Sequence, residues 1–355
     1  MKRFNAGAWR PALGEARLTA ANDLVQRTLS QHGLMPQTTR TGLEGGGTLP
    51  SLDGLLAQFG GAAKAMPPLP EGASFAQDTF ACPAGSRMYR TYIPAPRSGG
   101  ATGVVVMLHG CTQSPEDFAL GTGMNLLADH HGFIVVYPAQ SRGDNAQSCW
   151  NWFSRGDQRR GKGEPAILAE LTKQICADNG IGRDATFVAG LSAGAAMATI
   201  LAEAYPDVFA AVGAHSGLPV GAAKDVASAF AAMAGTVMEG GPAYTGGAVR
   251  TIAFHGAADA TVHPSNSDRI VQRALTGAAR QLIEDTQRGQ AGGRGFTRVI
   301  SSDPEGRNLV EHWSVEGLGH AWSGGQPGGS YTDPKGPDAS AEMIRFFFDT
   351  VTEGR

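Results

Sequence analysis

The stretch Gly190-Leu191-Ser192-Ala193-Gly194 is the point from which the whole chain is best interpreted. Residues 185–189 before it form a short apolar run typical of a strand, and residues 195–202 after it are small, apolar and helix-favouring. A serine on a tight turn between a strand and a helix has the context of a nucleophile elbow. The glycines suit such a turn because neighbouring chains come too close to leave room for large side chains. The alternative is a glycine-rich turn that merely contains a serine, and the flanking strand and helix favour the nucleophile.

The composition describes a globular chain with a large core. Of its 355 residues, 42% are hydrophobic and 17% are charged, which suits one large α/β domain with an appendage better than two equal domains. The formal charge of −3 gives no indication of a nucleic-acid partner or an anionic membrane. No apolar run in the sequence reaches transmembrane length, so we expect no membrane span.

The N-terminal residues and the cysteines indicate different cellular compartments. The first ten residues carry positive charge without the apolar segment of a signal peptide, so the default expectation is a cytoplasmic protein, with export as the alternative. The four cysteines, whose spacing fits neither a zinc site nor a redox motif, allow up to two disulfides. Disulfides would conflict with a reducing compartment. These cysteines are Cys82, Cys111, Cys149 and Cys176.

Residues 1–75 are expected to be an extension of the catalytic domain, which would cover 76–355. A helical pattern runs over 12–35, and residues 36–75 are rich in Gly, Pro and Thr, as in a linker. An oligomerisation arm, a surface anchor and a partly disordered tail are all open as roles for this extension.

From residue 76 onward, strand patterns alternate with helix patterns. This order predicts an α/β fold with a mostly parallel central sheet and helices on both faces. The predicted strands cover 86–93, 103–108, 133–137, 185–189, 210–214, 251–254, 297–300 and 309–315. The predicted helices cover 114–131, 164–177, 195–202, 266–286 and 339–351.

A serine nucleophile needs a histidine base and a carboxylate that orients the base, and after an elbow these follow in the order acid, then histidine. Asp259 fits the acid, because it lies in the loop after the predicted strand 251–254. His320 fits the base, because it lies in a glycine-flanked turn after the strand 309–315. Asp268 and Asp285 compete with Asp259, but we expect the first to begin a helix and the second to end it.

The oxyanion of an acyl-transfer reaction needs two backbone N–H donors. One is expected from Ala193, the residue after the nucleophile. The other is expected from Cys111, in the turn His109-Gly110-Cys111-Thr112-Gln113 that follows the strand 103–108; we call residues 109–113 the oxyanion turn. Cys111 as the nucleophile is the rival interpretation, and the elbow at Ser192 argues against it.

Three tryptophans are candidates for lining a substrate cleft. Trp150 and Trp152 belong to an aromatic cluster that could equally be core, whereas Trp322, two residues after His320, is the better cleft candidate.

These motifs together resemble the poly(3-hydroxybutyrate) depolymerase family of esterases, which is related to feruloyl and acetylxylan esterases. The resemblance runs from about Cys82 to Phe348. It rests on the residues 108–113, 149–153 (Cys-Trp-Asn-Trp-Phe), 190–194, His255-Gly256 with Asp259 and Val262, and 319–325 (Gly-His-Ala-Trp-Ser-Gly-Gly), with 329–334 and 336–340 in support.

The resemblance implies an α/β-hydrolase fold, the triad Ser192, Asp259 and His320, and an oxyanion site at the turn of Cys111. It also implies a disulfide between Cys111 and Cys149, which would tie the oxyanion turn to the aromatic cluster. No metal or organic cofactor is expected. Unlike extracellular polymer-degrading relatives, the sequence shows no polymer-binding domain after its closing helix, so we expect little attack on crystalline polymer.

The sequence therefore predicts a serine esterase that acts on hydroxyalkanoate oligomers or amorphous polyester. The first alternative is an esterase for feruloyl or acetyl groups on plant polysaccharide. An alternative of another class is a catalytically silent protein that binds polyester granules through residues 1–75, and a complete triad argues against it.

Overall fold

Fully buried strands form the centre of the fold. In the computed structural model, which describes residues 66–236, 249–278 and 281–349, the buried strands are β3 (Val104–Leu108), β4 (Ile134–Pro138), β5 (Thr186–Leu191), β6 (Ala211–His215) and β7 (Arg250–Gly256). Their mostly apolar sequences are what a strand needs when helices cover the sheet on both faces.

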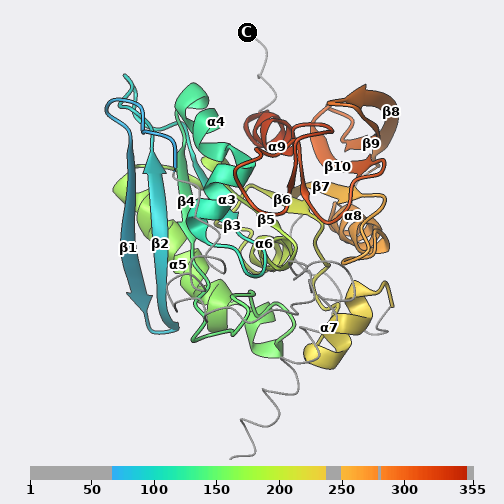
Figure 1. Cartoon of the computed structure of the whole chain (residues 1–355), viewed down its shortest axis with the longest axis horizontal. Helices are drawn as coiled ribbons and strands as arrows, with labels where there is room; N and C mark the ends of the chain where they lie inside the picture. Colours follow the sequence, from blue (N-terminus) through green and yellow to red (C-terminus); the bar gives the residue numbers. More distant parts are fainter. Residues whose placement is uncertain (1–65, 237–248, 279–280, 350–355) are drawn as a thin grey trace, which may run out of the picture. The chain divides into compact units, whose positions relative to one another are not determined.

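The described strands build a mixed sheet of ten strands in the order β1-β2-β4-β3-β5-β6-β7-β10-β9-β8. The six strands from β4 to β10 (Asn308–Val315) in this order are parallel to one another. Antiparallel pairs extend both ends, β1 (Ser74–Cys82) with β2 (Gly85–Ile93) at one end and β9 (Arg294–Ser302) with β8 (Ile283–Ala291) at the other (Figure 1). The expected mostly parallel sheet therefore describes the centre, while the edges are antiparallel.

Helices pack on both faces of this sheet. One apolar core lies between the sheet and α5 (Gly163–Asp178) and α6 (Ala193–Ala204). A second core lies on the other face, beneath α3 (Pro115–Thr122), α4 (Met124–His131) and α9 (Ala339–Phe348). The remaining α-helices of the described residues are α7 (Val226–Met233) and α8 (Ser265–Gly277), and a two-stranded pairing joins β11 (Trp322–Ser323) to β12 (Thr332–Asp333).

Two predicted helices differ from the structure. The single helix expected over 114–131 is two helices, because Gly123 adopts a left-handed conformation with φ of 63° that ends α3 and precedes α4. The helix expected over 266–286 ends at Gly277, and the polar residues from Ile283 onward form β8 instead. Pairing with β9 through a turn at Gly292 and Gly293 overrides the local pattern there.

The helix predicted over 12–35 and most of the predicted linker, up to residue 65, lie outside the described residues. Among the described helices, none combines the length and the apolar character needed to cross a membrane.

The turn after β5 is packed closely against the end of β3. A Cβ atom placed on Gly194 would lie 2.0 Å from the Leu108 carbonyl oxygen, and one on Gly190 would lie 2.4 Å from the Gly194 carbonyl carbon. Because these neighbours are backbone atoms, they cannot move aside as a flexible side chain would. The beginning of α6 is therefore pressed directly against the end of β3, where the oxyanion turn starts.

We predict that Gly194→Ala destabilises the protein by at least about 2–3 kcal/mol, because the new methyl group cannot be accommodated without moving β3 or α6. Gly182→Ala is the matched control, since nothing lies within 4 Å of its Cβ position and its φ is −84°. Urea unfolding of both variants measures the difference. Equal midpoints for Gly194→Ala and the wild type would contradict the packing argument.

Candidate active site

Ser192 lies at the strained turn between β5 and α6. Its φ of 56° and ψ of −117° are unusual for a residue with a side chain. The conformation is held from both sides, because the Ser192 N–H donates to the His215 carbonyl at 2.9 Å and the Ser192 carbonyl accepts from the Ala196 N–H at 2.9 Å. The residue is partly exposed, whereas Leu191 and Ala193 on either side are buried. The turn thus presents a serine side chain at the carboxyl end of the sheet.

Asp259 and His320 come from the loops that follow the neighbouring parallel strands β7 and β10. The two loops are joined by a hydrogen bond from the Ala258 N–H to the Leu318 carbonyl at 3.0 Å. They also require Gly256, where a Cβ would lie 2.2 Å from the same carbonyl oxygen. In this arrangement the His320 Nδ1–H donates to the Asp259 Oδ2 at 2.8 Å.

The surroundings of Asp259 keep its carboxylate ionised. Its side chain is fully buried, which by itself favours the neutral acid, but hydrogen bonds from His255, His320 and the Val262 N–H outweigh this effect and hold the pKa of Asp259 well below its ordinary value. The Oδ1 atom accepts the backbone N–H groups of Thr261 and Val262, each at 2.9 Å. Because the Nδ1–H of His320 donates to this carboxylate, the lone pair of the neutral imidazole lies on Nε2.

The third contact of a triad, between the Ser192 Oγ and the His320 Nε2, is not a hydrogen bond among the described residues, and the Nε2 has no other partner there. Catalytic contacts are often longer without substrate and tighten when substrate binds. The structure thus brings Asp259 and His320 into contact and leaves one imidazole nitrogen free at the edge of the sheet where Ser192 lies.

Several backbone polar groups of the oxyanion turn are held by hydrogen bonds. The Gly110 N–H donates to the Gln113 Oε1 at 2.9 Å, and the Thr112 N–H donates to the Gln147 carbonyl at 2.8 Å. Within the part of the chain that the structure describes, the Cys111 N–H has no acceptor, and neither does the Ala193 N–H at the first turn of α6. These are the two N–H groups that the sequence predicts as oxyanion donors.

Cys111 and Cys149 form a disulfide in the structure, as the family resemblance implies. It connects the oxyanion turn to the loop 139–153 across a sequence separation of 38 residues. A closed loop of this length restricts the unfolded chain and contributes about 3–4 kcal/mol to stability. Cys82 and Cys176 are free.

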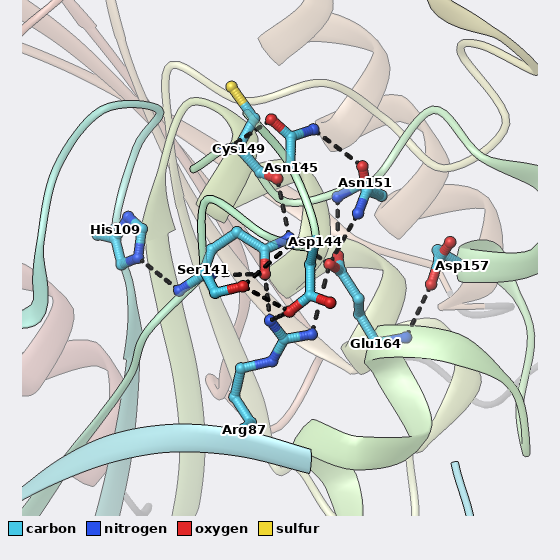
Figure 2. A network of polar contacts seen from close by, with 10 residues as sticks. Arg87, His109, Ser141, Asp144, Asn145, Cys149, Asn151, Asp157 and Glu164 are labelled. Atoms are coloured by element: carbon cyan, nitrogen blue, oxygen red, sulfur yellow. Dashed lines mark hydrogen bonds and ion pairs between the residues drawn. The ribbon is translucent and has the colours of Figure 1, made fainter. Parts of the chain in front are cut away.

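A buried polar network also holds the loop 139–153 in place (Figure 2). The Glu164 carboxylate accepts the Asn151 N–H at 2.7 Å and the side-chain amides of Asn151 and Gln140, and it lies 3.6 Å from the Arg87 guanidinium. Gln140 in turn donates from its side chain to the Cys149 carbonyl at 2.9 Å and from its backbone to the His109 Nε2 at 3.1 Å. Burial raises the pKa of Glu164 although Asn151 and Arg87 oppose the shift. Sequence reasoning missed this network, because its members are scattered over 78 positions and share no motif.

The proposed aromatic cleft is a wrong prediction, because the structure buries Trp150, Trp152 and Trp322 to 0%, 6% and 1% exposure. The Trp150 Nε1–H donates to the His109 carbonyl at 3.0 Å, so this indole supports the oxyanion turn from the core. Trp152 packs in the same core. Trp322 stacks on the ring of His215 and donates to the Ser340 Oγ at 3.0 Å, beneath the site rather than at its surface.

Two further histidines at this edge are buried and neutral. The His215 Nε2 accepts the Ser323 N–H at 3.0 Å, so it connects the strand beside Ser192 to the segment after His320. Burial, reinforced by the charges of His255 and His320, lowers the pKa of His215 to about 3. Burial likewise lowers the pKa of His109 to about 4. In the sequence, the only indication of a role for His109 and His215 was their position at the ends of predicted strands.

Comparison with known proteins finds similarity to esterases and depolymerases. Residues 87–292 match the family described as esterase PHB depolymerase. The chain is 33% identical over 249 residues to poly(3-hydroxyalkanoate) depolymerase C of Paucimonas lemoignei, an alignment of 67% of this chain and 59% of that protein. It is 28% identical over 257 residues to feruloyl esterase B of Neurospora crassa, covering 67% of this chain and 84% of the relative.

A probable acetylxylan esterase A of Aspergillus fumigatus is 29% identical over 201 residues, 52% of this chain and 53% of the relative. The chain thus spans between half and three-fifths of the length of this relative and of the depolymerase. Among solved structures, the acetyl xylan esterase from Aspergillus awamori has the same fold, with a TM-score of 0.62 at 21% identity over 77% of this chain and 98% of that one.

We predict that stability falls as the pH decreases from about 6.5 to 4.5. An imidazole in the unfolded chain takes up a proton near pH 6.5, whereas His109 and His215 stay neutral in the folded protein until about pH 4 and 3. The unfolded state then binds more protons than the folded state, so acid favours unfolding by up to about 1.4 kcal/mol per pH unit for each histidine.

Glu164, whose pKa is raised, acts in the opposite direction and reduces the net slope. Urea midpoints measured at intervals between pH 7 and pH 4.5 give this slope. Below about pH 5 the carboxyl groups with lowered pKa, such as Asp259, add to the acid destabilisation because their unfolded forms take up protons, so the slope between pH 7 and about pH 5 is the one that reports the histidines. A midpoint that stays constant or rises toward acid would contradict the assignment of two neutral buried imidazoles.

Proposed function

Because the chain belongs to the esterase PHB depolymerase family, we propose that it is a serine esterase of the α/β-hydrolase class that cleaves carboxylic esters through an acyl-enzyme. The observation that carries the proposal is the contact of His320 with the ionised Asp259 beside the strained turn of Ser192. A buried, hydrogen-bonded carboxylate of this kind orients an imidazole and stabilises its charged form. A merely structural aspartate would not need a histidine with one free nitrogen.

In the proposed reaction, the Ser192 Oγ attacks the ester carbonyl while the His320 Nε2 takes the hydroxyl proton. The carbonyl oxygen becomes an oxyanion, which the N–H groups of Cys111 and Ala193 stabilise. Collapse of this intermediate breaks the bond to the alcohol, which leaves with the proton from His320. Water then attacks the acyl-Ser192 ester with His320 again as the base, which releases the acid and restores the serine.

The proposed substrates are short hydroxyalkanoate oligomers and amorphous polyester. The similarity to a poly(3-hydroxyalkanoate) depolymerase supports this class. The buried tryptophans support it as well, because no indole among the described residues is exposed to stack on an aromatic acid. Hydrolysis of feruloyl esters is the second candidate, and its support is the alignment with 84% of a feruloyl esterase.

The role of Ser192 is tested with Ser192→Ala and p-nitrophenyl butyrate. Removal of the nucleophile should lower kcat by about 10⁴-fold or more, with little change in the thermal midpoint. Ser154→Ala, at a partly exposed serine with no hydrogen bond from its side chain to the following turn, is the matched control and should keep full activity. Turnover near that of the wild type in folded Ser192→Ala would disprove the serine mechanism.

The substrate class is tested by comparing kcat/KM for soluble hydroxybutyrate oligomers with kcat/KM for methyl ferulate. We expect the oligomers to be cleaved faster, because their short methyl branches need no aromatic platform. Ser192→Ala serves as the blank in both assays. A higher kcat/KM for methyl ferulate would replace the polyester proposal by the feruloyl one and leave the triad unchanged.

A further inference from the structure

We infer that Gln113 is a positioning residue for the oxyanion turn, which holds the Cys111 N–H in the direction that the reaction requires. The inference rests on the proposed function, since it concerns how the oxyanion site of that reaction is built. Gln113 is neither the nucleophile nor the base, and it is not one of the two proposed oxyanion donors. It belongs to the motif after β3, yet the triad leaves it without a role.

Gln113 is 94% buried and uses both ends of its amide. Its Oε1 accepts the Gly110 N–H at 2.9 Å. Its Nε2 donates to the Asp117 Oδ2 at 2.9 Å and to the carbonyl and Oγ of Ser330 at 3.1 and 3.2 Å. A glutamine supplies an acceptor and a donor on one rigid plane, and this site uses both.

The hydrogen bond from the Gly110 N–H to Gln113 fixes the peptide that precedes the one carrying the proposed donor. Once the Gly110 N–H points at Gln113, the preceding peptide plane is fixed, and the following N–H, that of Cys111, is the one left without an acceptor among the described residues. The Gly110 carbonyl is held as well, by the His109 Nδ1–H at 2.8 Å. Gln113 thus fixes the peptide between His109 and Gly110 through its side chain, and its backbone N–H, which donates to the Gly110 carbonyl at 3.3 Å, helps to fix the next peptide, which carries the Cys111 N–H. It does so without touching the reacting atoms.

The other end of the amide is anchored on a distant segment. Asp117, in the first turn of α3, also accepts the Ser330 N–H at 2.8 Å and the Ser330 hydroxyl. The segment that carries Ser330 is pressed onto the same helix, because a Cβ on Gly329 would lie 2.3 Å from the Gly121 Cα. The segment follows His320 in the chain. Gln113 thus connects the turn of Cys111 to the loop that leads away from the proposed base.

An oxyanion donor stabilises charge that develops only in the transition state, so a donor that loses its direction lowers kcat more than it raises KM. Removal of a complete donor costs about 10²–10³-fold in kcat. A donor that is retained but no longer held in place should cost less. We therefore expect a loss of about 10–100-fold in kcat when Gln113 can no longer accept the Gly110 N–H.

The test uses the full chain with its disulfide and three variants. Gln113→Met removes both polar ends at similar length. Asp117→Asn keeps the shape but weakens the anchor of the Nε2, and should give a smaller loss of kcat. Ser114→Ala is the matched control, because it removes the N-cap that accepts the Asp117 N–H at 3.2 Å and leaves the bond between Gly110 and Gln113 in place. It should lower the thermal midpoint without changing kcat.

With p-nitrophenyl butyrate, Gln113→Met should lose about 10–100-fold in kcat with KM within about threefold of the wild type. The inhibition constant of a propyl trifluoromethyl ketone, which forms a tetrahedral adduct with a serine, should rise by the same factor. A kcat within about threefold of the wild type, or a loss confined to KM, would overturn the inference. If Gln113→Met does not fold, the order of kcat for Asp117→Asn and Ser114→Ala decides in the same way.

Hydrogen exchange of the Gly110 amide separates this inference from the proposed function. The amide should exchange slowly in the wild type and in Ser114→Ala, and at least about tenfold faster in Gln113→Met or, more weakly, in Asp117→Asn. Equal exchange in all variants would overturn the inference even if the wild type is an active esterase. A wild type that cleaves no ester, with the expected exchange pattern, would overturn the proposed function and leave the hold of Gln113 on the turn established.

Discussion

The contact between the beginning of α6 and the end of β3 is the constraint on which the site depends. With a hydrogen atom as its side chain, Gly194 lets the helix meet the Leu108 carbonyl, where any Cβ would lie 2.0 Å from that oxygen. The contact brings the turn of Ser192 against the turn of Cys111, two segments that lie some 80 positions apart in the chain. The parallel strands β6, β7 and β10 then add His215, the last residue of β6, and the loops of Asp259 and His320 at the same edge. The close packing of α6 against β3 therefore brings Ser192 to the edge of the sheet where Asp259 and His320 lie.

The oxyanion turn is held by four kinds of restraint. A disulfide, an indole N–H and a buried ionic network reach it from other parts of the chain, and the side-chain amide of its own Gln113 holds it from within. Some of these groups are unfavourable for stability by themselves, because burying Arg87 with Glu164 removes two charges from water. Their common effect is to fix backbone N–H groups in direction. A reaction that is accelerated by preorganised dipoles benefits from such a rigid turn.

The histidines at this edge differ in what surrounds them rather than in where they lie. His109 and His215 are enclosed by apolar groups and accept backbone N–H groups, so burial keeps them neutral. His320 instead faces an ionised carboxylate on one nitrogen and, within the residues that the structure describes, has no hydrogen-bond partner on the other. The same side chain therefore serves as a fixed acceptor at two positions and is suited to exchange a proton at the third.

The sequence by itself determined which strands carry the key residues, because a buried parallel strand has a continuous apolar run and its loop follows directly. The positions of Ser192, Asp259 and His320 after the ends of such strands were predicted in this way. It could not determine depth: aromatic residues near the site were expected at a cleft surface, whereas Trp150, Trp152 and Trp322 lie in the core. Nor could it predict β8, whose polar residues gain their strand conformation only by pairing with β9. Burial, edge pairing and the partners of Gln113 depend on segments far apart in the chain, so only the tertiary structure decided them.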